Sequence, residues 1–206
     1  MRKLYFFLLF ILPALSNAQQ FEEEIKEAFQ KEPKIDLRMD SRHSFINQTG
    51  VKVFGIKMGV QYDKKISLGL GYNILWEPLE RQIEYKGLLH KVELGFYNFS
   101  PYIEYIFYRD ERWELSIPVQ LGFGSSYYSN KEDYGPKKIY SKFVMSYEPA
   151  ITFQYRFLKY FGAGMGVGYR LMVLPNSKLE EKFTSPVYIF KTNIYFEDIY
   201  KDLKGE

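Results

Sequence analysis

Between Trp113 and Gly124, every second residue is large and apolar, and the residues between them are polar or are glycines. This period of two is that of a β-strand with one apolar face and one polar or bare face. The apolar set is Trp113, Leu115, Ile117, Val119, Leu121 and Phe123, and the opposite set is Glu114, Ser116, Pro118, Gln120, Gly122 and Gly124. The segment therefore needs an apolar environment on one side of a sheet and a polar one on the other.

The same two-sided pattern recurs along the chain and predicts eight strands. They cover residues 51–62, 66–76, 83–97, 101–108, 113–124, 139–155, 161–173 and 186–196. The connections 109–112 and 156–160 are short, whereas 125–138 and 174–185 are long and polar. An even number of antiparallel strands with short periplasmic turns and longer outer loops is typical of outer-membrane barrels. The predicted fold is all-β, an eight-stranded antiparallel up-and-down transmembrane β-barrel.

The first residues carry the features of an export signal. Arg2 and Lys3 form a positive head, residues 4–15 form an apolar run, and Ser16-Asn17-Ala18 resembles a signal peptidase site. The apolar run is shorter than the roughly 20 residues that a membrane-spanning helix needs. We therefore predict a signal peptide at residues 1–18, cleaved near Ala18, and a final location in the cell outer membrane.

The composition limits the kinds of partner and anchor that the chain can have. Loss of Arg2 and Lys3 with the signal leaves 26 basic and 25 acidic side chains, so nothing indicates a nucleic-acid partner. The 206 residues include no cysteine, which excludes disulfides and a lipid-modified cysteine. The chain has 19 tyrosines and 18 phenylalanines, a richness that suits the aromatic belts at the two faces of a membrane.

The segment between the signal and the first predicted strand is expected to be periplasmic. Residues 19–31 predict a short amphipathic helix, which is either a cap over the lumen or a docking element for a partner. Residues 35–50 are predicted to be irregular, with a local ion pair between Asp40 and Arg42. The expected organisation is a periplasmic N-terminal segment at 19–50, the barrel at 51–196 and a periplasmic tail at 197–206.

The predicted inward face carries charges of both signs, which must be paired or hydrated in a narrow interior. Glycines alternate from 162 to 168, which leaves room for large neighbouring side chains such as Tyr195 to cross the lumen. We therefore predict a side-chain-filled lumen, with a narrow channel or small-solute site as the alternative. The predicted lumen charge network consists of Lys57, Glu93, Glu104, Glu114, Lys142, Glu148, Arg170 and Lys191.

The sequence offers little for catalysis. Only two histidines are present, His43 beside Ser41 and Ser44, and His90 near no obvious nucleophile. Barrel enzymes of the hydrolase and acyltransferase kind need a base within hydrogen-bond reach of a nucleophile. We predict no catalytic residue, no metal site and no cofactor.

These features together resemble the small outer-membrane β-barrel proteins of Bacteroidetes-type bacteria, eight-stranded barrels of the OmpA/OmpX kind. The resemblance is carried by the segment Asp40-Ser41-Arg42-His43-Ser44-Phe45-Ile46, by Trp113-Glu114-Leu115 and by the Gly-x-Gly strands. The resemblance implies the fold of the protein and its location, and it implies no enzymatic activity.

The expected role is therefore structural or surface-interacting and non-enzymatic. The expected partners are outer-membrane lipid, the barrel assembly machinery and an extracellular partner at loops 125–138 and 174–185. Alternation alone does not say which face of each strand is outward. A soluble periplasmic lipocalin-like barrel that binds an apolar ligand is therefore a further alternative.

Overall fold

The structure is a computed structural model that describes residues 21–46, 49–77, 79–85, 87–130, 137–179, 182–195 and 202–204. The predicted signal peptide and most of the predicted tail lie outside the described residues. The strands are β1 (Lys34–Ile46), β2 (Thr49–Tyr62), β3 (Ile66–Leu75), β4 (Leu79–Tyr85), β5 (Leu88–Arg109), β6 (Trp113–Asn130), β7 (Lys137–Arg156), β8 (Phe161–Leu174) and β9 (Ser185–Ile194).

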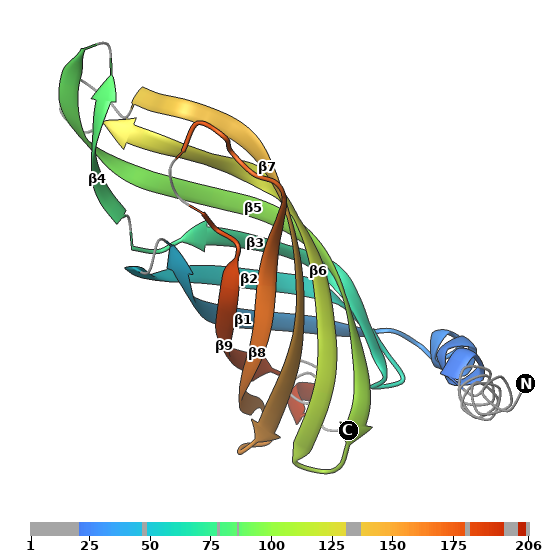
Figure 1. Cartoon of the computed structure of the whole chain (residues 1–206). Helices are drawn as coiled ribbons and strands as arrows, with labels where there is room; N and C mark the ends of the chain where they lie inside the picture. Colours follow the sequence, from blue (N-terminus) through green and yellow to red (C-terminus); the bar gives the residue numbers. More distant parts are fainter. Residues whose placement is uncertain are drawn as a thin grey trace, which may run out of the picture.

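The strands form one antiparallel sheet that closes into a ring (Figure 1). The order in the sheet is β3-β2-β1-β9-β8-β7-β6-β5-β4, and β3 also pairs with β5. β3 pairs with β5 from Ile66↔Tyr105 to Ile74↔Tyr97, and β4 pairs with the rest of β5 from Leu79↔Leu94 onward. β3 and β4 thus share one position in the wall. The predicted eight-stranded up-and-down barrel is confirmed.

β1 corrects the sequence analysis. Residues 34–46 are a regular strand that pairs with β2 on one side and β9 on the other, so β1 closes the ring. The prediction that residues 35–50 are irregular is therefore wrong, and the barrel begins at Lys34 rather than at residue 51. The pattern was missed because the outward row of β1 includes Ser41 and His43, which interrupt the apolar alternation.

β5 is the second correction. The predicted strands 83–97 and 101–108 overlap a single strand of 22 residues, and residues 79–85 form the short additional strand β4. Pro101 does not end β5: pairing with β3 runs through it, and pairing with β6 resumes in the same register at Tyr102. The missing N–H of proline removes one ladder hydrogen bond without turning the chain. The prediction omitted β1 but counted β5 as two strands, so the predicted total of eight strands is still right.

The two ends of the barrel differ. The short connections 63–65, 110–112 and 157–160 lie at one end, which we call the turn end. At the opposite end, the loop end, β5, β6 and β7 reach much further than their neighbours (Figure 1). Most of the predicted loop 125–138 that is described is strand, because β6 runs to Asn130 and β7 begins at Lys137.

A helix at residues 21–29 lies outside the barrel at the turn end (Figure 1). The ring of Phe21 contacts that of Tyr105 at 4.9 Å between centroids, and Phe29 contacts Tyr62 at 5.0 Å. Both tyrosines belong to the outward rows of their strands, so the interpretation of the helix as a cap over the lumen is wrong. No helix among the described residues is long and apolar enough to cross a membrane.

Candidate functional site: the barrel lumen

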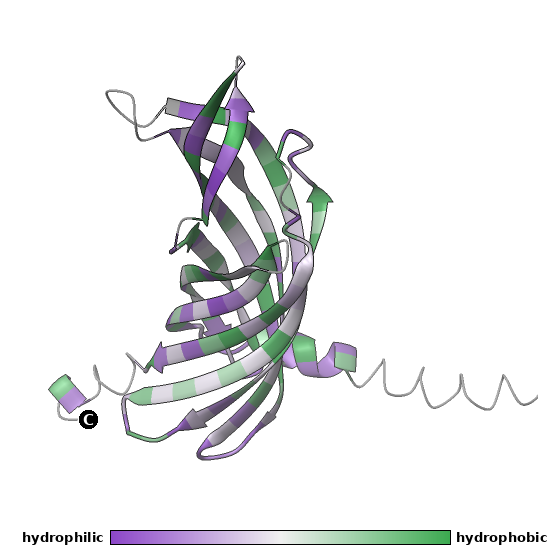
Figure 2. Cartoon of the chain, turned by 60° about the vertical axis from the view of Figure 1, so that its left-hand side comes forward, coloured by the Kyte–Doolittle hydropathy of each residue, from purple (hydrophilic) through white to green (hydrophobic). Residues whose placement is uncertain are grey.

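Apolar and polar residues alternate along the strands (Figure 2), and the exposed fractions of the side chains show that the apolar rows face outward and the polar rows inward. In β2, Ile56 and Met58 are 47% and 66% exposed, whereas Lys57 between them is 8% exposed. The predicted outward direction of these apolar rows is confirmed. A lipocalin-like barrel would need the reverse arrangement, with the apolar rows inside.

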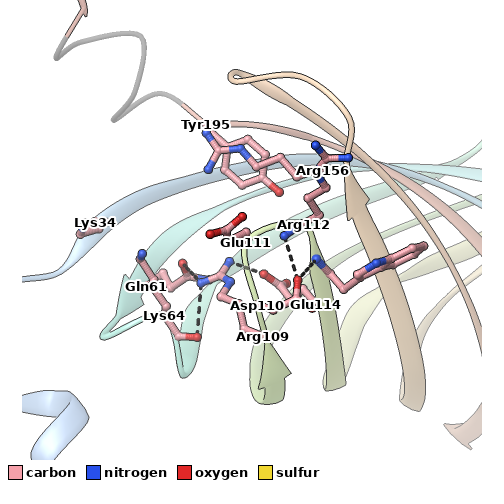
Figure 3. A pocket seen from close by; sticks show the side chains of 11 residues that line it. Lys34, Gln61, Lys64, Arg109, Asp110, Glu111, Arg112, Glu114, Arg156 and Tyr195 are labelled. Atoms are coloured by element: carbon pink, nitrogen blue, oxygen red, sulfur yellow. Dashed lines mark hydrogen bonds and ion pairs between the residues drawn. The ribbon is translucent and has the colours of Figure 1, made fainter.

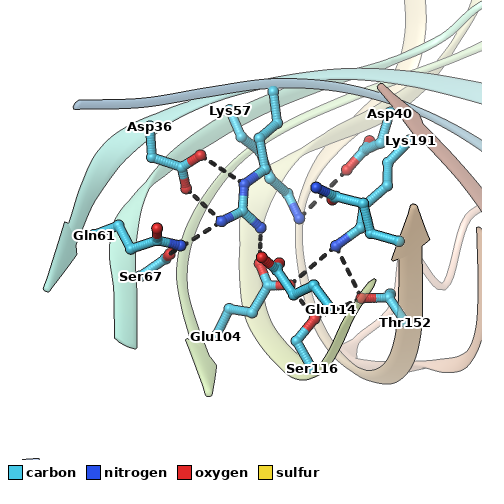
Figure 4. Close-up of polar contacts among 12 residues, drawn as sticks. Asp36, Asp40, Lys57, Gln61, Ser67, Glu104, Glu114, Ser116, Thr152 and Lys191 are labelled. Atoms are coloured by element: carbon cyan, nitrogen blue, oxygen red, sulfur yellow. Dashed lines mark hydrogen bonds and ion pairs between the residues drawn. The ribbon is translucent and has the colours of Figure 1, made fainter. Parts of the chain in front are cut away.

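The first buried charge cluster is centred on Arg38 and Glu104 (Figure 4). Arg38 Nε donates to Asp36 Oδ1 at 2.7 Å, and its Nη1 donates to Glu104 Oε2. Lys191 Nζ donates to Glu104 Oε1 at 3.1 Å. These groups come from β1, β5 and β9, so the cluster ties together strands from opposite sides of the ring.

Two hydroxyl groups complete the Arg38–Glu104 cluster. Ser116 Oγ donates to Glu104 Oε1 and lies 2.8 Å from Thr152 Oγ1. Lys191 Nζ donates to that same threonine oxygen at 2.9 Å. Both carboxylate oxygens of Glu104 therefore accept hydrogen bonds, which is what a buried charge needs to be stable.

The second cluster is centred on Arg42 and Glu148. Arg42 Nη2 donates to Asp40 Oδ2 at 2.6 Å, and its Nε lies 3.3 Å from Glu148 Oε1. Arg170 Nε donates to Glu148 Oε2 at 2.7 Å. Lys57 Nζ lies 3.3 Å from Asp40 Oδ2 and so joins this cluster to β2. The predicted ion pair between Asp40 and Arg42 is confirmed, although it lies within the lumen.

The structure places six of the eight predicted network residues in the interior. Lys57, Glu104, Glu148, Arg170 and Lys191 belong to the two clusters, and Glu114 pairs with Arg109 near the turn end.

Glu93 and Lys142 lie outside the network. Glu93 is on the outward face, because β5 is continuous and its even-numbered residues face inward from Val92 to Ile106. The predicted break between two strands had allowed the inward face to change from one strand to the next. Lys142 is exposed at the loop end, where its Nζ donates to Ser177 Oγ at 3.0 Å.

Four charged residues of the two clusters were not predicted to lie in the lumen, and all four belong to β1. Asp36, Arg38, Asp40 and Arg42 alternate along the strand and alternate in sign. A search for charged residues at a period of two, in place of apolar ones, finds this row. The row also supplies the central arginine of each cluster, so the site could not be assembled without β1.

The loop-end part of the interior is apolar instead of charged. Val92, Leu94 and Phe96 are buried there, on the face of β5 opposite Glu93, so the inward direction predicted for Glu93 is reversed. The described residues of the connection, 175–179 and 182–184, fold inward, and Phe183 stacks on Phe96 at 5.1 Å between ring centroids. The predicted polar outer loop at 174–185 thus includes side chains that close the lumen, Leu179 among them.

Little space remains between the two clusters. A cavity bounded by Arg38, Asp40, Lys57, Glu104 and Lys191, among others, has a volume of about 20 Å³. That is room for about one water molecule. Glycines make this filling possible, as predicted: a Cβ on Gly164 would lie 3.1 Å from Lys191 Cγ. The interior at this level is packed with side chains.

A larger cavity of about 350 Å³ opens at the turn end (Figure 3). Arg109 crosses it, donating to Gln61 Oε1 at 3.1 Å and to Glu114 Oε2. The other oxygen of Glu114 is buried without a hydrogen-bond partner in the described structure. At the rim, the backbone N–H groups of Trp113 and Arg112 donate to Asp110 and hold the pKa of that carboxyl below its usual range.

In the described part of the chain, the hydroxyl oxygen of Ser41, near His43, has no hydrogen-bond partner. His43 points outward, with its ring edge-on to Phe190 at 5.5 Å, whereas Ser44 points inward to Ser185 Oγ at 2.5 Å. His90 lies on the β4–β5 hairpin with its ring 6.1 Å from that of Tyr85. Among the described residues, no group of three or more His, Cys, Asp or Glu could hold a metal ion.

No protein-family model matches this chain, and its sequence matches no curated protein. Among solved structures, Neisserial surface protein A is similar over 80% of this chain and 99% of its own, with a TM-score of 0.57 and 10% identity.

The N-terminal β-barrel domain of Pseudomonas aeruginosa OprF matches over 79% of this chain and 98% of its own, with a TM-score of 0.47 and 10% identity. Ail, the attachment invasion locus protein of Yersinia pestis, has the same coverage, a TM-score of 0.48 and 12% identity. The likeness to Neisserial surface protein A shows that this chain has the same small β-barrel fold.

Proposed function

We propose that this protein is an exported, non-enzymatic integral outer-membrane β-barrel with a structural or surface-interaction role. The observation that carries the proposal is the combination of an apolar outer wall with a lumen closed by paired charges. An apolar wall of alternating residues is stable against lipid. A closed lumen leaves the loop end, rather than a pore, as the part that meets other molecules.

The first experiment tests location and closure together. Cells that express the full chain are fractionated, and the protein is run on a detergent gel with and without boiling. We expect recovery in the outer membrane and a mobility shift on boiling, because a closed barrel resists unfolding by detergent alone. Recovery as a soluble periplasmic protein would contradict the proposal.

The second experiment separates a filled lumen from a narrow channel. Glu104→Gln and Glu148→Gln each leave buried cations without their carboxylate partner, which costs about 3–5 kcal/mol. We expect both variants to lose unfolding free energy in vesicles while planar bilayers stay non-conducting. The matched control is Glu80→Gln, whose exposed pair with Lys91 is worth about 0–1 kcal/mol. A change in ion preference without loss of stability would favour the channel.

A second candidate function is small-solute binding at the turn end. It is favoured by the 350 Å³ cavity and by the buried, unpartnered oxygen of Glu114. A solute with a carboxylate for the arginines and an amine for Glu114 suits this lining. Glycine should then raise the melting temperature of the wild type but not that of Arg156→Gln. Inorganic phosphate is tested in the same way for comparison. Equal melting temperatures with and without glycine would exclude this function.

A further inference from the structure

The helix at residues 21–29 is fixed to the outer wall rather than to the lumen. Beyond its two ring contacts, Glu24 Oε2 accepts a hydrogen bond from Lys65 Nζ at 3.0 Å, in the turn between β2 and β3. That hydrogen bond raises the pKa of Lys65 above its usual range. The helix therefore contacts β2 and β5, which flank β3, and the turn between β2 and β3.

The burial of Ile66 shows what the helix covers. Ile66 stands in register with Tyr62 on β2 and Tyr105 on β5, so it belongs to the same outward row. It is nevertheless only 2% exposed, whereas Leu70 further along that row is 64% exposed. The rings of Phe21 and Phe29 contact the two neighbours of Ile66, and Ala28 of the helix is fully buried. The helix thus lies across the wall at Ile66.

The level at which the helix lies is marked by exposed aromatic rings. Exposed aromatic side chains lie at the turn end from β5 to β8, and such a belt marks the boundary between lipid and water. They are Phe107, Tyr108, Trp113, Phe157 and Phe161, each between 39% and 54% exposed. Phe21 and Phe29 are 43% and 45% exposed and extend this belt sideways from the wall.

The opposite side of the helix is charged. Glu22, Glu23, Lys26 and Glu27 are exposed, and Lys26 pairs with Glu22 at 2.6 Å. An apolar stripe beside the aromatic belt and a charged side away from it is the pattern of a helix that lies in a membrane interface.

We propose that helix 21–29 is an interfacial anchor that lies on the turn-end leaflet of the membrane. Its occupant is the lipid surface: the exposed edges of Phe21 and Phe29 enter the headgroup boundary, and the charged side stays in water. The anchor also holds the β2–β3 turn through Lys65 and Glu24. This inference rests on the proposed membrane barrel.

The test uses the absence of cysteine in the chain, which makes every introduced cysteine unique. Nitroxide labels are placed at Phe21→Cys and Phe29→Cys, and for comparison at Glu23→Cys and Glu27→Cys on the charged side. Met58→Cys and Val167→Cys, exposed on the outer wall, serve as references for lipid. The barrel is refolded in phosphatidylethanolamine and phosphatidylglycerol vesicles. Collision rates with oxygen and with a water-soluble nickel chelate are then measured.

The expected ratio of oxygen to nickel collisions is above one at positions 21, 29, 58 and 167, and below one at 23 and 27. Ratios below one at 21 and 29 with lipid-like wall references would overturn the anchor while the barrel stands. Protection of 21 and 29 from both reagents would also overturn it, because the rings would then be covered by protein. Water-like ratios at 58 and 167 would instead contradict the membrane barrel itself.

A second variant keeps an aromatic ring at the contact, in case cysteine weakens docking of the helix. Phe29→Trp, in a background with Trp76→Phe and Trp113→Phe, is refolded in vesicles that contain brominated lipids. We expect loss of fluorescence when the bromines are near the headgroup end of the acyl chain. Unchanged fluorescence at every bromine depth would overturn the anchor.

Discussion

Asn176 is a single buried side chain that holds the inward-folded connection in place. Its Nδ2 donates to the carbonyl of Tyr140 at 2.8 Å and to that of Ser126 at 3.1 Å. Tyr140 has a positive φ of 53° and lies at an irregularity in the pairing of β6 and β7. The amide of Asn176 joins the connection to both of these strands at that point.

We therefore expect Asn176→Ala to lower the unfolding free energy by about 1–3 kcal/mol, because two buried carbonyls lose their donor. Urea titration of the refolded barrel in vesicles, followed by tryptophan fluorescence, measures this loss. Ser177→Ala is the matched control, since its hydroxyl accepts a hydrogen bond from the exposed Lys142. Equal stability of the two variants would show that Asn176 does not hold the connection.

At the scale of the element, β1 decides whether the ring closes. Ser41 is paired with Phe54 on β2 and Phe190 on β9, and its hydroxyl oxygen is buried without a hydrogen-bond partner in the described structure. Ser41→Pro removes a ladder N–H and places a ring between two paired strands.

We expect Ser41→Pro to abolish the boiling-dependent gel shift, whereas Ser41→Ala keeps it and unfolds at the same or higher urea concentration. The alanine variant removes only an unpaired hydroxyl, so it is the proper control for the backbone effect. A normal gel shift for the proline variant would mean that the barrel closes without a complete β1.

The strands that the sequence predicts well are those with one apolar face and one polar or bare face. β6 and β8 start where the alternation predicts, at Trp113 and Phe161. β1 was hidden because both of its faces carry polar residues, and only the alternation of charge along it gives a signal. In β5, Asn98-Phe99-Ser100-Pro101 has the composition of a turn, yet pairing on both sides overrides that local preference.

The candidate site is less predictable than the strands. The inward charges could be proposed from parity, but their partners depend on which strands become neighbours across the lumen. Arg38 and Glu104 are 66 positions apart in sequence, and their contact follows only from ring closure. The apolar loop-end layer was missed for the same reason, since Leu179 and Phe183 belong to a connection whose composition is polar overall.

At the scale of the molecule, the lumen has two closures in series. The charge clusters close its middle, and the apolar layer with Phe183 closes its loop end. Arg170 links them, with its guanidinium 5.9 Å from the centre of the Phe96 ring.

We expect Phe183→Ala to cost about 3 kcal/mol through the cavity it leaves, yet to produce no conductance in planar bilayers. The reason is that the charge clusters still fill the middle of the barrel. Phe45→Ala, which changes a partly exposed ring on the outer wall, is the control for general loss of apolar surface. Channel activity in Phe183→Ala alone would show that the charge clusters do not close the path.

The unequal strand lengths have a consequence for how the surface is approached. A tilted strand needs about 9–11 residues to cross a bilayer, so much of the 22-residue β5 and of β7 stands beyond it, whereas the 10 residues of β9 do not. At the loop end, the barrel wall is therefore high on the side of β5 and β7 and low on the side of β9. In the proposed outer-membrane barrel, a large molecule that moves along the membrane therefore reaches the loop end from one direction only, over the low side of the wall.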